Sequence, residues 1–313
     1  MNGFIVIDKP EGMTSHDVVN RIRRITGQKK AGHTGTLDPF ATGVLPVALG
    51  EATKAIPFLD ESIKEYRATL LFGRATDTQD YTGAPVLEGD WTTLDSEAVQ
   101  RLAVKFLGKQ QQCPPMFSAL KHQGTPLYKL ARRGIEIERP SREVEIHALS
   151  IEAITLPEVS FTVRCSRGTY VRTLAHDLGM SAGCGAHLLQ LRRTASGPFR
   201  IEDALSLETV ASLAREGKLS QQSVTVRSAL NHLTFLTLSE RGVVQVRHGI
   251  IPDRAEVAVS SVSPAPGDRL VLAGAHQILA VAEVTDLEQD QRAEAPLSMR
   301  FLRVFNDLCL YRP

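Results

Sequence analysis

Cysteine is scarce in this 313-residue chain. The few thiols lie far apart, form no Cys-x-x-Cys pair and join no Cys/His cluster with the spacing of a zinc site. This distribution argues against a disulfide framework and against a structural metal. We expect free thiols, as in a reducing cytoplasm, at all four positions: Cys113, Cys165, Cys184 and Cys309.

Long hydrophobic runs are also absent. The N-terminal apolar stretch, residues 3–7, is too short for a signal peptide and follows no basic segment. No other stretch has the length needed to span a membrane. We therefore expect a cytoplasmic protein without membrane contact, whose 42% hydrophobic residues can fill the cores of two domains.

Charge of one sign is not in excess, because 36 Lys and Arg stand against 35 Asp and Glu. This balance gives no whole-protein sign of a polyanionic partner, so any nucleic-acid site must be local. The sequence contains neither a Walker A loop nor a Gly-x-Gly-x-x-Gly motif. We expect the protein to use no cofactor and no metal.

Residues 32–45, Gly-His-Thr-Gly-Thr-Leu-Asp-Pro-Phe-Ala-Thr-Gly-Val-Leu, hold three glycines and a single carboxylate, Asp38. Glycine frees the backbone, while Pro39 fixes its own φ and disfavours the α region for Asp38. We therefore predict a shaped loop, neither helix nor strand, that presents Asp38 in a fixed orientation. Such a carboxylate suits nucleophilic catalysis, although an Asp-Pro pair is also a common turn signal.

The whole string resembles the motif of the TruB-type pseudouridine synthases, Gly-His-Thr-Gly-x-Leu-Asp-Pro-x-Ala-x-Gly-x-Leu. In that family the aspartate is the nucleophile, which implies this role for Asp38. The resemblance also implies that His33 moves into the RNA loop and stacks there after a base has flipped out. By itself, a loop histidine bonded to the backbone fits His33 equally well.

Residues 8–15, Asp-Lys-Pro-Glu-Gly-Met-Thr-Ser, form a turn by composition, and Thr14 offers an N-cap for a helix that ends at Gly27. This string is similar to the opening motif of the same family. The similarity implies that Lys9 and Pro10 buttress the catalytic pocket.

Residues 64–73 alternate and are rich in strand formers, so they predict a strand. A tyrosine in a strand is usually core packing, but the family resemblance places Tyr66 of this Lys-x-Tyr motif against the target base as the candidate for proton transfer. Residues 73–80 resemble the family's Gly-x-x-Thr-Asp-Thr-x-Asp. The match implies that Asp80 helps to position the flipped nucleotide.

Residues 161–200 are the most basic region, with six arginines against one acid. An alternating strand is predicted to break at Gly168, before a helix. The string Ser-x-Gly-Thr-Tyr-x-Arg-Thr resembles the family motif whose arginine pairs with the nucleophilic aspartate. This resemblance implies that Arg172 is the partner of Asp38 and that Tyr170 lines the same pocket.

Residues 184–193 are similar to the family's Cys-Gly-Ala-His-x-x-x-Leu-Arg-Arg, which implies that Leu191 forms the apolar wall beneath the target base. We interpret His187 as a structural histidine near a helix. Residues 113–142 resemble the family's inserted segment that clamps the RNA arm. Their basic charge fits this role, but a solvated helix explains the charge about as well.

From about residue 231 the chain changes to short β-like runs between Gly/Pro turns, which predicts a small β-rich domain. The family resemblance suggests a PUA-like domain at 231–313, after a catalytic domain at 1–230. A mainly structural role for the C-terminal domain stays open. The runs are 243–246, 256–259, 269–272 and 278–284.

The prediction as a whole is an α+β fold with a largely antiparallel central sheet flanked by helices. The resemblance implies isomerisation of uridine 55 to pseudouridine in the TΨC arm of tRNA, by an aspartate nucleophile and base flipping. It also implies a monomer that needs tRNA but no obligate protein partner. An RNA-binding folding module that does not need Asp38 is the alternative, while a glycoside hydrolase would need a second carboxylate. Whether Asp38 attacks C1′, attacks C6 or assists elimination stays open.

Overall fold

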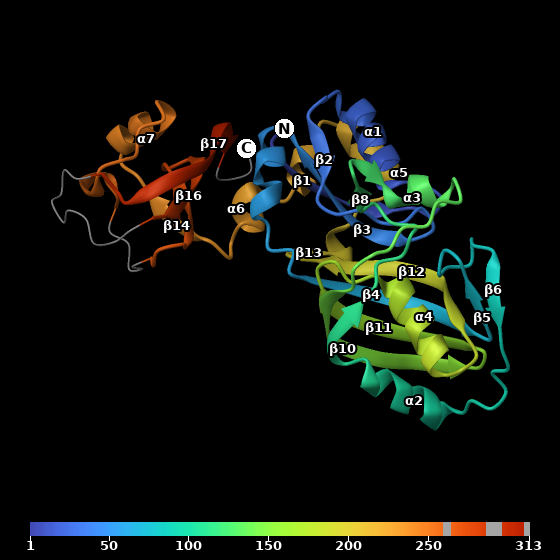
Figure 1. Cartoon of the computed structure of the whole chain (residues 1–313). Coiled ribbons are helices and arrows are strands. Elements are labelled where there is room, and N and C mark those ends of the chain that lie inside the picture. The colour runs from blue at the N-terminus through green and yellow to red at the C-terminus, as the bar shows by residue number, and fades with distance from the viewer. Residues whose placement is uncertain (259–263, 286–295, 310–313) are drawn as a thin grey trace.

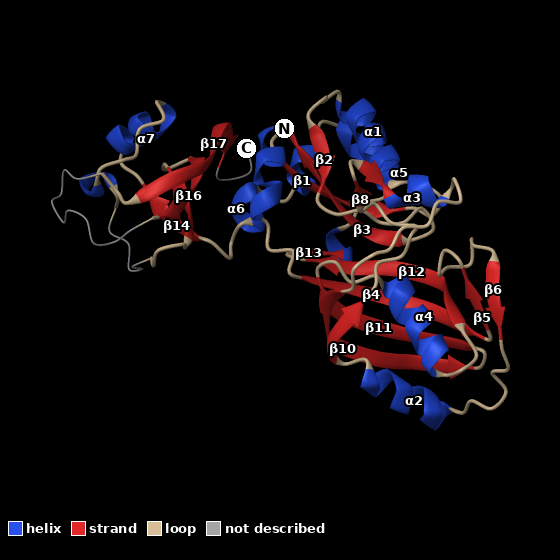
Figure 2. Ribbon diagram, viewed as in Figure 1, coloured by secondary structure: helices blue, strands red, loops and turns tan. Residues whose placement is uncertain are grey.

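The computed structural model describes residues 1–258, 264–285 and 296–309, which form two β-sheets with flanking helices (Figure 1, Figure 2). The larger sheet has the strand order β1-β3-β12-β4-β11-β10-β7, with β2 beside β3 and β13 beside β12. Only the pairing of β3 with β12 is parallel among these strands, which confirms the predicted α+β fold with a largely antiparallel sheet. The strands are β1 (Gly3–Lys9), β2 (Ala31–His33), β3 (Thr42–Leu49), β4 (Ile63–Phe72), β7 (Gly108–Gln112), β10 (Arg142–Thr155), β11 (Glu158–Ser166), β12 (Ala186–Ser196) and β13 (Phe199–Arg200).

The central motif contributes more strand than the sequence predicts. Its first two residues belong to β2 and its last four to β3, so that only residues 34–41 are loop. The expectation of a loop throughout is wrong at both ends because pairing with β1 and β2 outweighs the glycine content of β3. Gly43 has φ +97°, and a Cβ there would lie 2.2 Å from Arg193 O of β12. Glycine at this position therefore allows β3 to approach β12.

Helices cover the large sheet in two groups (Figure 1). α2 (Ser96–Lys105) packs on β10 and α4 (Val171–Ser181) on β12, while α1 (Ser15–Thr26) and α5 (Leu207–Arg215) pack together beside β1 and β2. The predicted bounds of α1 are confirmed, because Thr14 forms a capping box with Asp17 and Gly27 ends the helix at φ +66°. Gly168 separates β11 from α4, as predicted.

Shorter elements connect these layers. Those between β3 and β10 are η1 (Gly50–Phe58), β5 (Arg74–Thr76), β6 (Pro85–Glu88), β8 (Lys121–His122), β9 (Thr125–Pro126) and α3 (Leu127–Ala131). Those that follow β13 are η2 (Ile201–Asp203), η3 (Leu219–Gln222) and α6 (Val226–Ala229). Within the described ranges no helix is both long and apolar enough to cross a membrane.

The predicted small β-rich domain is present as a second sheet of order β14-β15-β16-β17. Two of the four predicted runs are its strands β15 and β16, whereas run 243–246 lies in helix α7 and that prediction is wrong. Ser239 caps this helix, and Val243 and Val246 lie three residues apart on its packed face. Run 256–259 begins at the end of η4 and reaches residue 259, outside the described residues. The elements are β14 (Thr234–Thr237), α7 (Glu240–Arg247), η4 (Arg254–Glu256), β15 (Arg269–Ala273), β16 (Gln277–Val284) and β17 (Met299–Cys309).

The two sheets share a hydrophobic cluster. Phe4 of β1 and Val44 of β3 belong to the same buried group as Val271, Ile278 and Phe305 of the C-terminal sheet. Polar contacts extend this interface, since Glu51 accepts a hydrogen bond from the backbone N–H at position 306 (2.9 Å). Burial on both sides fixes the C-terminal sheet against β1 and β3.

Candidate active site

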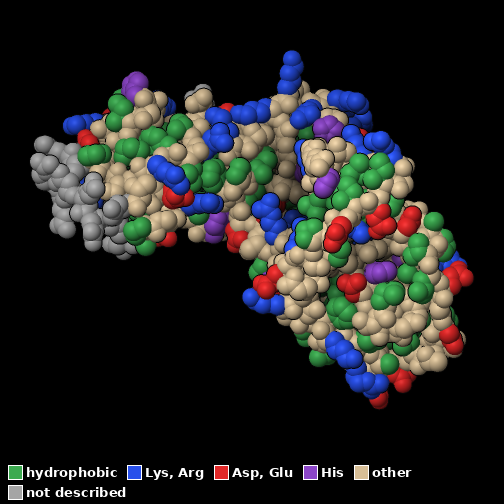
Figure 3. All heavy atoms as spheres, in the orientation of Figure 1, with side chains coloured by type: hydrophobic (Ala, Val, Ile, Leu, Met, Phe, Trp, Pro, Cys, Tyr) green, Lys and Arg blue, Asp and Glu red, His purple; other side chains and the backbone are tan. Residues whose placement is uncertain are grey.

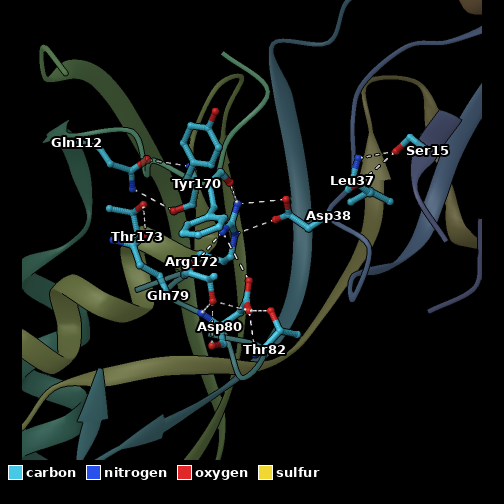
Figure 4. A network of polar contacts seen from close by, with 12 residues as sticks. Ser15, Leu37, Asp38, Gln79, Asp80, Thr82, Gln112, Tyr170, Arg172 and Thr173 are labelled. Carbon is cyan, nitrogen blue, oxygen red and sulfur yellow. Dashed lines mark hydrogen bonds and ion pairs between the residues drawn. The ribbon is translucent and has the colours of Figure 1, made fainter. Parts of the chain in front are cut away.

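Asp38 and Arg172, 134 residues apart in sequence, point toward each other and form an ion pair (Figure 4). Arg172 Nη2 donates to Asp38 Oδ1 (3.1 Å), and Nε lies 2.8 Å from Oδ2. The Asp38 side chain keeps 31% exposure while that of Arg172 keeps 3%. The carboxylate therefore faces open space and the cation lies behind it, an arrangement that suits attack on a bound substrate.

Backbone carbonyls and a second acid hold the Arg172 guanidinium. Nη1 donates to Thr78 O (2.7 Å) and Nη2 to Phe117 O (2.7 Å). Asp80 Oδ2 lies 3.5 Å from Nη1. Asp80 is buried and lies behind Arg172, so the structure brings it to the ion pair.

Opposing influences act on the Asp38 carboxyl. Although part of the Asp38 side chain faces the cavity, loss of hydration among the surrounding protein atoms is the largest influence. It raises the pKa of Asp38 above its usual value, and the nearby Asp80 acts in the same direction. The Arg172 guanidinium opposes both by its charge and its hydrogen bond. The arginine therefore favours the ionised form that a nucleophile needs.

Hydrogen bonds from Lys9 and Ser15 fix the loop that carries Asp38. Lys9 is fully buried, and its ammonium group donates to three carbonyl oxygens, those of Pro10 (2.8 Å), Met13 (2.6 Å) and Pro39 (3.0 Å). Ser15 Oγ accepts from the backbone N–H of Leu37 (2.8 Å). These contacts support the predicted buttressing by Lys9 and Pro10, because they tie the segment after β1 to the residues on both sides of Asp38.

A cavity of about 410 Å³ opens at Asp38. Six of the residues singled out in the sequence line it together: His33, Asp38, Tyr66, Tyr170, Arg172 and Leu191. Asp80 does not line this cavity. It lines an adjoining one of about 460 Å³, which shares His33, Asp38 and Arg172 with the first.

Tyr66 lies on the inner wall of the first cavity and is 8% exposed. Burial raises the pKa of the Tyr66 hydroxyl to about 12. His33 stands at the junction of the two cavities, and its Nδ1 is buried without a hydrogen-bond partner among the described residues. Burial lowers the pKa of His33, which favours the uncharged form of a ring that can stack.

Two further residues hold the wall around Tyr170. Gln112 forms a pair of hydrogen bonds with the Tyr170 backbone, accepting from N (2.8 Å) and donating to O (3.1 Å). The Arg142 guanidinium lies 5.1 Å from the centre of the Tyr170 ring, at cation–π distance. Neither contact was predicted, because both connect residues far apart in sequence.

The inserted segment between β7 and β10 reaches the site. Its Phe117 carbonyl binds Arg172, and Ser118 lines both cavities. His187 lies in strand β12, on which α4 packs, and its buried ring donates a hydrogen bond to Arg74 O (2.8 Å), as expected of a structural histidine. Across the residues described, no group of three or more His, Cys, Asp or Glu is placed to hold a metal ion.

Comparison with known proteins gives concordant matches. Residues 23–171 match the model of the TruB family pseudouridylate synthase N-terminal domain, and residues 172–233 match that of the tRNA pseudouridylate synthase B C-terminal domain. The tRNA pseudouridine synthase B of Geobacter sulfurreducens is 55% identical over 98% of this chain and 100% of its own length. That of Geotalea uraniireducens is 57% identical over 90% of this chain and 92% of its own length.

Solved structures with the same fold include components of H/ACA ribonucleoprotein complexes. An archaeal box H/ACA sRNP Nop10–Cbf5 complex aligns with a TM-score of 0.73 at 26% identity, over 97% of this chain and 86% of that one. An H/ACA RNP bound to a substrate RNA containing 2′-deoxyuridine aligns at 0.74 and 25%, over 99% and 88%. By sequence and by fold, the chain belongs to the TruB family of pseudouridylate synthases.

Proposed function

We propose that this protein isomerises uridine 55 of the tRNA TΨC arm to pseudouridine, with Asp38 as the nucleophile. The observation that carries the proposal is the Asp38–Arg172 ion pair, which opens into a cavity shared with Tyr66, Tyr170 and Leu191. Pseudouridine synthases are isomerases, and the relatives at 55–57% identity are tRNA pseudouridine synthases. The substrate site and the residue roles are inferred from the matched motifs.

The isomerisation is redox-neutral and intramolecular. The C1′–N1 bond breaks, a C1′–C5 bond forms, C5 loses a proton and N1 gains one. The reaction thus needs an ionised carboxylate, an apolar wall that holds the detached uracil, and a proton carrier. Asp38, Leu191 and Tyr66 supply these functions at one cavity.

The target uridine must leave its stack, because no side chain reaches C1′ or C5 inside folded RNA. The two joined cavities offer room for extruded nucleotides, and His33 at their junction can fill the gap left in the RNA. Asp80 helps to position the flipped nucleotide indirectly, through Arg172.

The RNA backbone needs cations close to the site. Figure 3 shows Lys and Arg side chains gathered in the hollow between the C-terminal sheet and the large sheet. The active cavity itself has Lys64, Arg142 and Arg167 in its lining. The inserted segment, about 113–142, clamps the RNA arm in this proposal, and a PUA-like domain at 231–313 follows the catalytic domain 1–230. The protein acts as a monomer.

The test uses a TΨC-arm hairpin RNA that carries tritium at uracil C5. Formation of the C1′–C5 bond expels that hydrogen, so released tritium counts turnover. Native protein and Asp38→Asn are compared at equal RNA occupancy, and we expect release by the native protein alone. If both proteins bind the RNA tightly and neither releases tritium, the alternative of an RNA-folding module replaces the catalytic assignment.

A further inference from the structure

Of the residues that the structure describes, Arg193 has the largest completely buried side chain, and nothing in the proposed reaction yet uses it. It lies on β12, directly opposite Tyr66 of β4 in the antiparallel register. Residues opposite each other in a ladder project from the same face of the sheet. The guanidinium therefore lies beside the tyrosine that lines the active cavity.

Two of the three guanidinium nitrogens are committed to the backbone near Asp38. Nε donates to Val44 O of β3 (2.7 Å), and Nη2 donates to Gly35 O of the catalytic loop (3.1 Å). Nη1 is buried and makes no well-formed hydrogen bond to the described residues. Since a buried cation with an unused donor is costly, the position calls for a further role.

Other charged groups converge on the same place. A Cβ on Gly35 would lie 2.8 Å from Lys64 Nζ, 3.7 Å from Arg193 Nη1 and 3.9 Å from Glu61 Oε1. Glu61 is buried, so its carboxylate offsets part of the positive charge at this end of the cavity. Two cations therefore stand against one acid at this end of the cavity, and of these the Arg193 charge opposes the effect of burial on Tyr66.

We propose that Arg193 is a positioning residue that stabilises the phenolate form of Tyr66 and thereby allows the Tyr66 oxygen to carry the C5 proton. The proposal rests on the role assigned to Tyr66 in the proposed function. Burial disfavours the phenolate, whereas the charge of the nearby Arg193 guanidinium favours it. The other titratable groups that act on Tyr66 are Cys165 of β11 and Asp38, and both disfavour the phenolate.

Arg193 and Lys64 interact electrostatically with each other and with further titratable groups. These groups are Glu61 and Arg167 at the cavity, His33 on β2 and Lys9 on β1. Burial and the neighbouring Arg193 lower the pKa of Lys64 to about 8. Lys64 can therefore lose its charge in mildly alkaline solution, whereas Arg193 keeps its charge throughout.

The proton balance closes within the cavity. After the C1′–N1 bond has broken with its electron pair on N1, C5 bonds to C1′ and still carries its hydrogen. The Tyr66 phenol gives its proton to N1, which leaves a phenolate beside Arg193. That phenolate then accepts the C5 proton, the C5–H electrons restore the ring double bond, and the phenol is regenerated. No oxidant or reductant takes part.

The experiment compares Arg193→Gln with Arg192→Gln. Arg192 is adjacent in sequence but projects from the opposite face, where it pairs with Asp8 (2.8 and 2.9 Å). A polyfluorinated tyrosine is placed at position 66, because its more acidic phenol brings the titration into an accessible range. The fluorine signal is followed against pH, and single-turnover tritium release is measured at saturating RNA.

We expect Arg193→Gln to move the fluorine titration to higher pH and to shift the pH–rate profile in the same direction. At neutral pH the rate should fall about 10- to 100-fold, within the range of a lost proton-transfer catalyst. Arg192→Gln should leave both curves unchanged. Arg193→Lys keeps a positive charge at this buried position and serves as the variant that should still fold. Its fluorine titration should lie between those of the native protein and Arg193→Gln.

An unchanged fluorine titration in Arg193→Gln would overturn the proposal, even if the rate had fallen through distortion of the loop. The proposed function fails by different results. Absence of tritium release from the native protein would remove the activity, and a native rate in Tyr66→Phe would remove the role of Tyr66. The fluorine titration reports on the contact between Arg193 and Tyr66 in either case.

Discussion

Asp80 Oδ2 lies 3.5 Å from Nη1 of Arg172, the same guanidinium that holds Asp38. The other oxygen of Asp80 accepts hydrogen bonds from the Thr78 hydroxyl (2.8 Å) and from the Thr82 N–H and hydroxyl (3.0 and 2.5 Å). Only Oδ2 is therefore directed to the arginine. Asp80 therefore has two opposing effects. It orients Arg172, and its negative charge raises the pKa of Asp38.

Asp80→Asn should separate these two effects. The amide oxygen can still accept from Thr78 and Thr82, while an NH2 group replaces the oxygen that faces Arg172. We expect single-turnover tritium release to slow about 10- to 100-fold through misplacement of Arg172, with RNA affinity unchanged. Asp77→Asn is the matched control, because Asp77 lies in the same segment and accepts only from Ala84 N (2.8 Å) among the hydrogen bonds seen. Equal rates for the two variants would contradict the role of Asp80.

Arg172→Lys should change the pH dependence of the reaction. A lysine cannot hold Thr78 O, Phe117 O and the carboxylate together, so it favours the ionised form of Asp38 less. The pKa of Asp38 then rises further, and the acid limb of the pH–rate profile moves to higher pH. We expect the rate at neutral pH to fall about 100-fold or more. A rate loss with an unmoved acid limb would mean that Arg172 acts on the substrate and not on Asp38.

Gly43→Ala should destabilise the large sheet. The substitution places a Cβ 2.2 Å from Arg193 O and also forces a left-handed φ of +97° on a non-glycine residue. We expect a loss of about 3 kcal/mol or more in the free energy of unfolding, measured in urea. Gly183→Ala isolates the backbone contribution, because Gly183 has φ +80° with nothing within 4 Å of its Cβ. It should cost about 1 kcal/mol. Similar costs for both would show that β3 and β12 can separate freely.

Asp177→Asn tests a buried acid that the reaction does not use. Burial raises the pKa of Asp177 from 3.8 to about 6, so the folded protein holds this proton more tightly than the unfolded chain. Ionisation above pH 6 therefore costs stability, and the cost disappears below about pH 4. The amide should stabilise the protein by about 1 kcal/mol at pH 7.5 and have little effect at pH 4, measured by thermal unfolding. Equal effects at both pH values would contradict the raised pKa.

Local sequence determined much of this molecule. The capping box at Thr14 and the left-handed Gly27 set the bounds of α1, because both act within a few residues. The long motif around Asp38 and the Arg-rich motif around Arg172 identified two residues that the fold brings to 2.8 Å. A linear motif can carry such information, since each part of the site occupies one continuous stretch.

Tertiary structure decided the rest. Residues 243–246 form a helix because a cap and a packing surface outweigh the β propensity of valine. Only the fold shows that Asp80 faces Arg172, and only the register of β12 with β4 places Arg193 beside Tyr66. Alternation along residues 191–193 predicts that Leu191 and Arg193 lie on one face of the strand, but it does not predict which strand pairs with it. The physical reason is that pairing between distant strands is set by global packing, whereas caps and turns are set by neighbours in the chain.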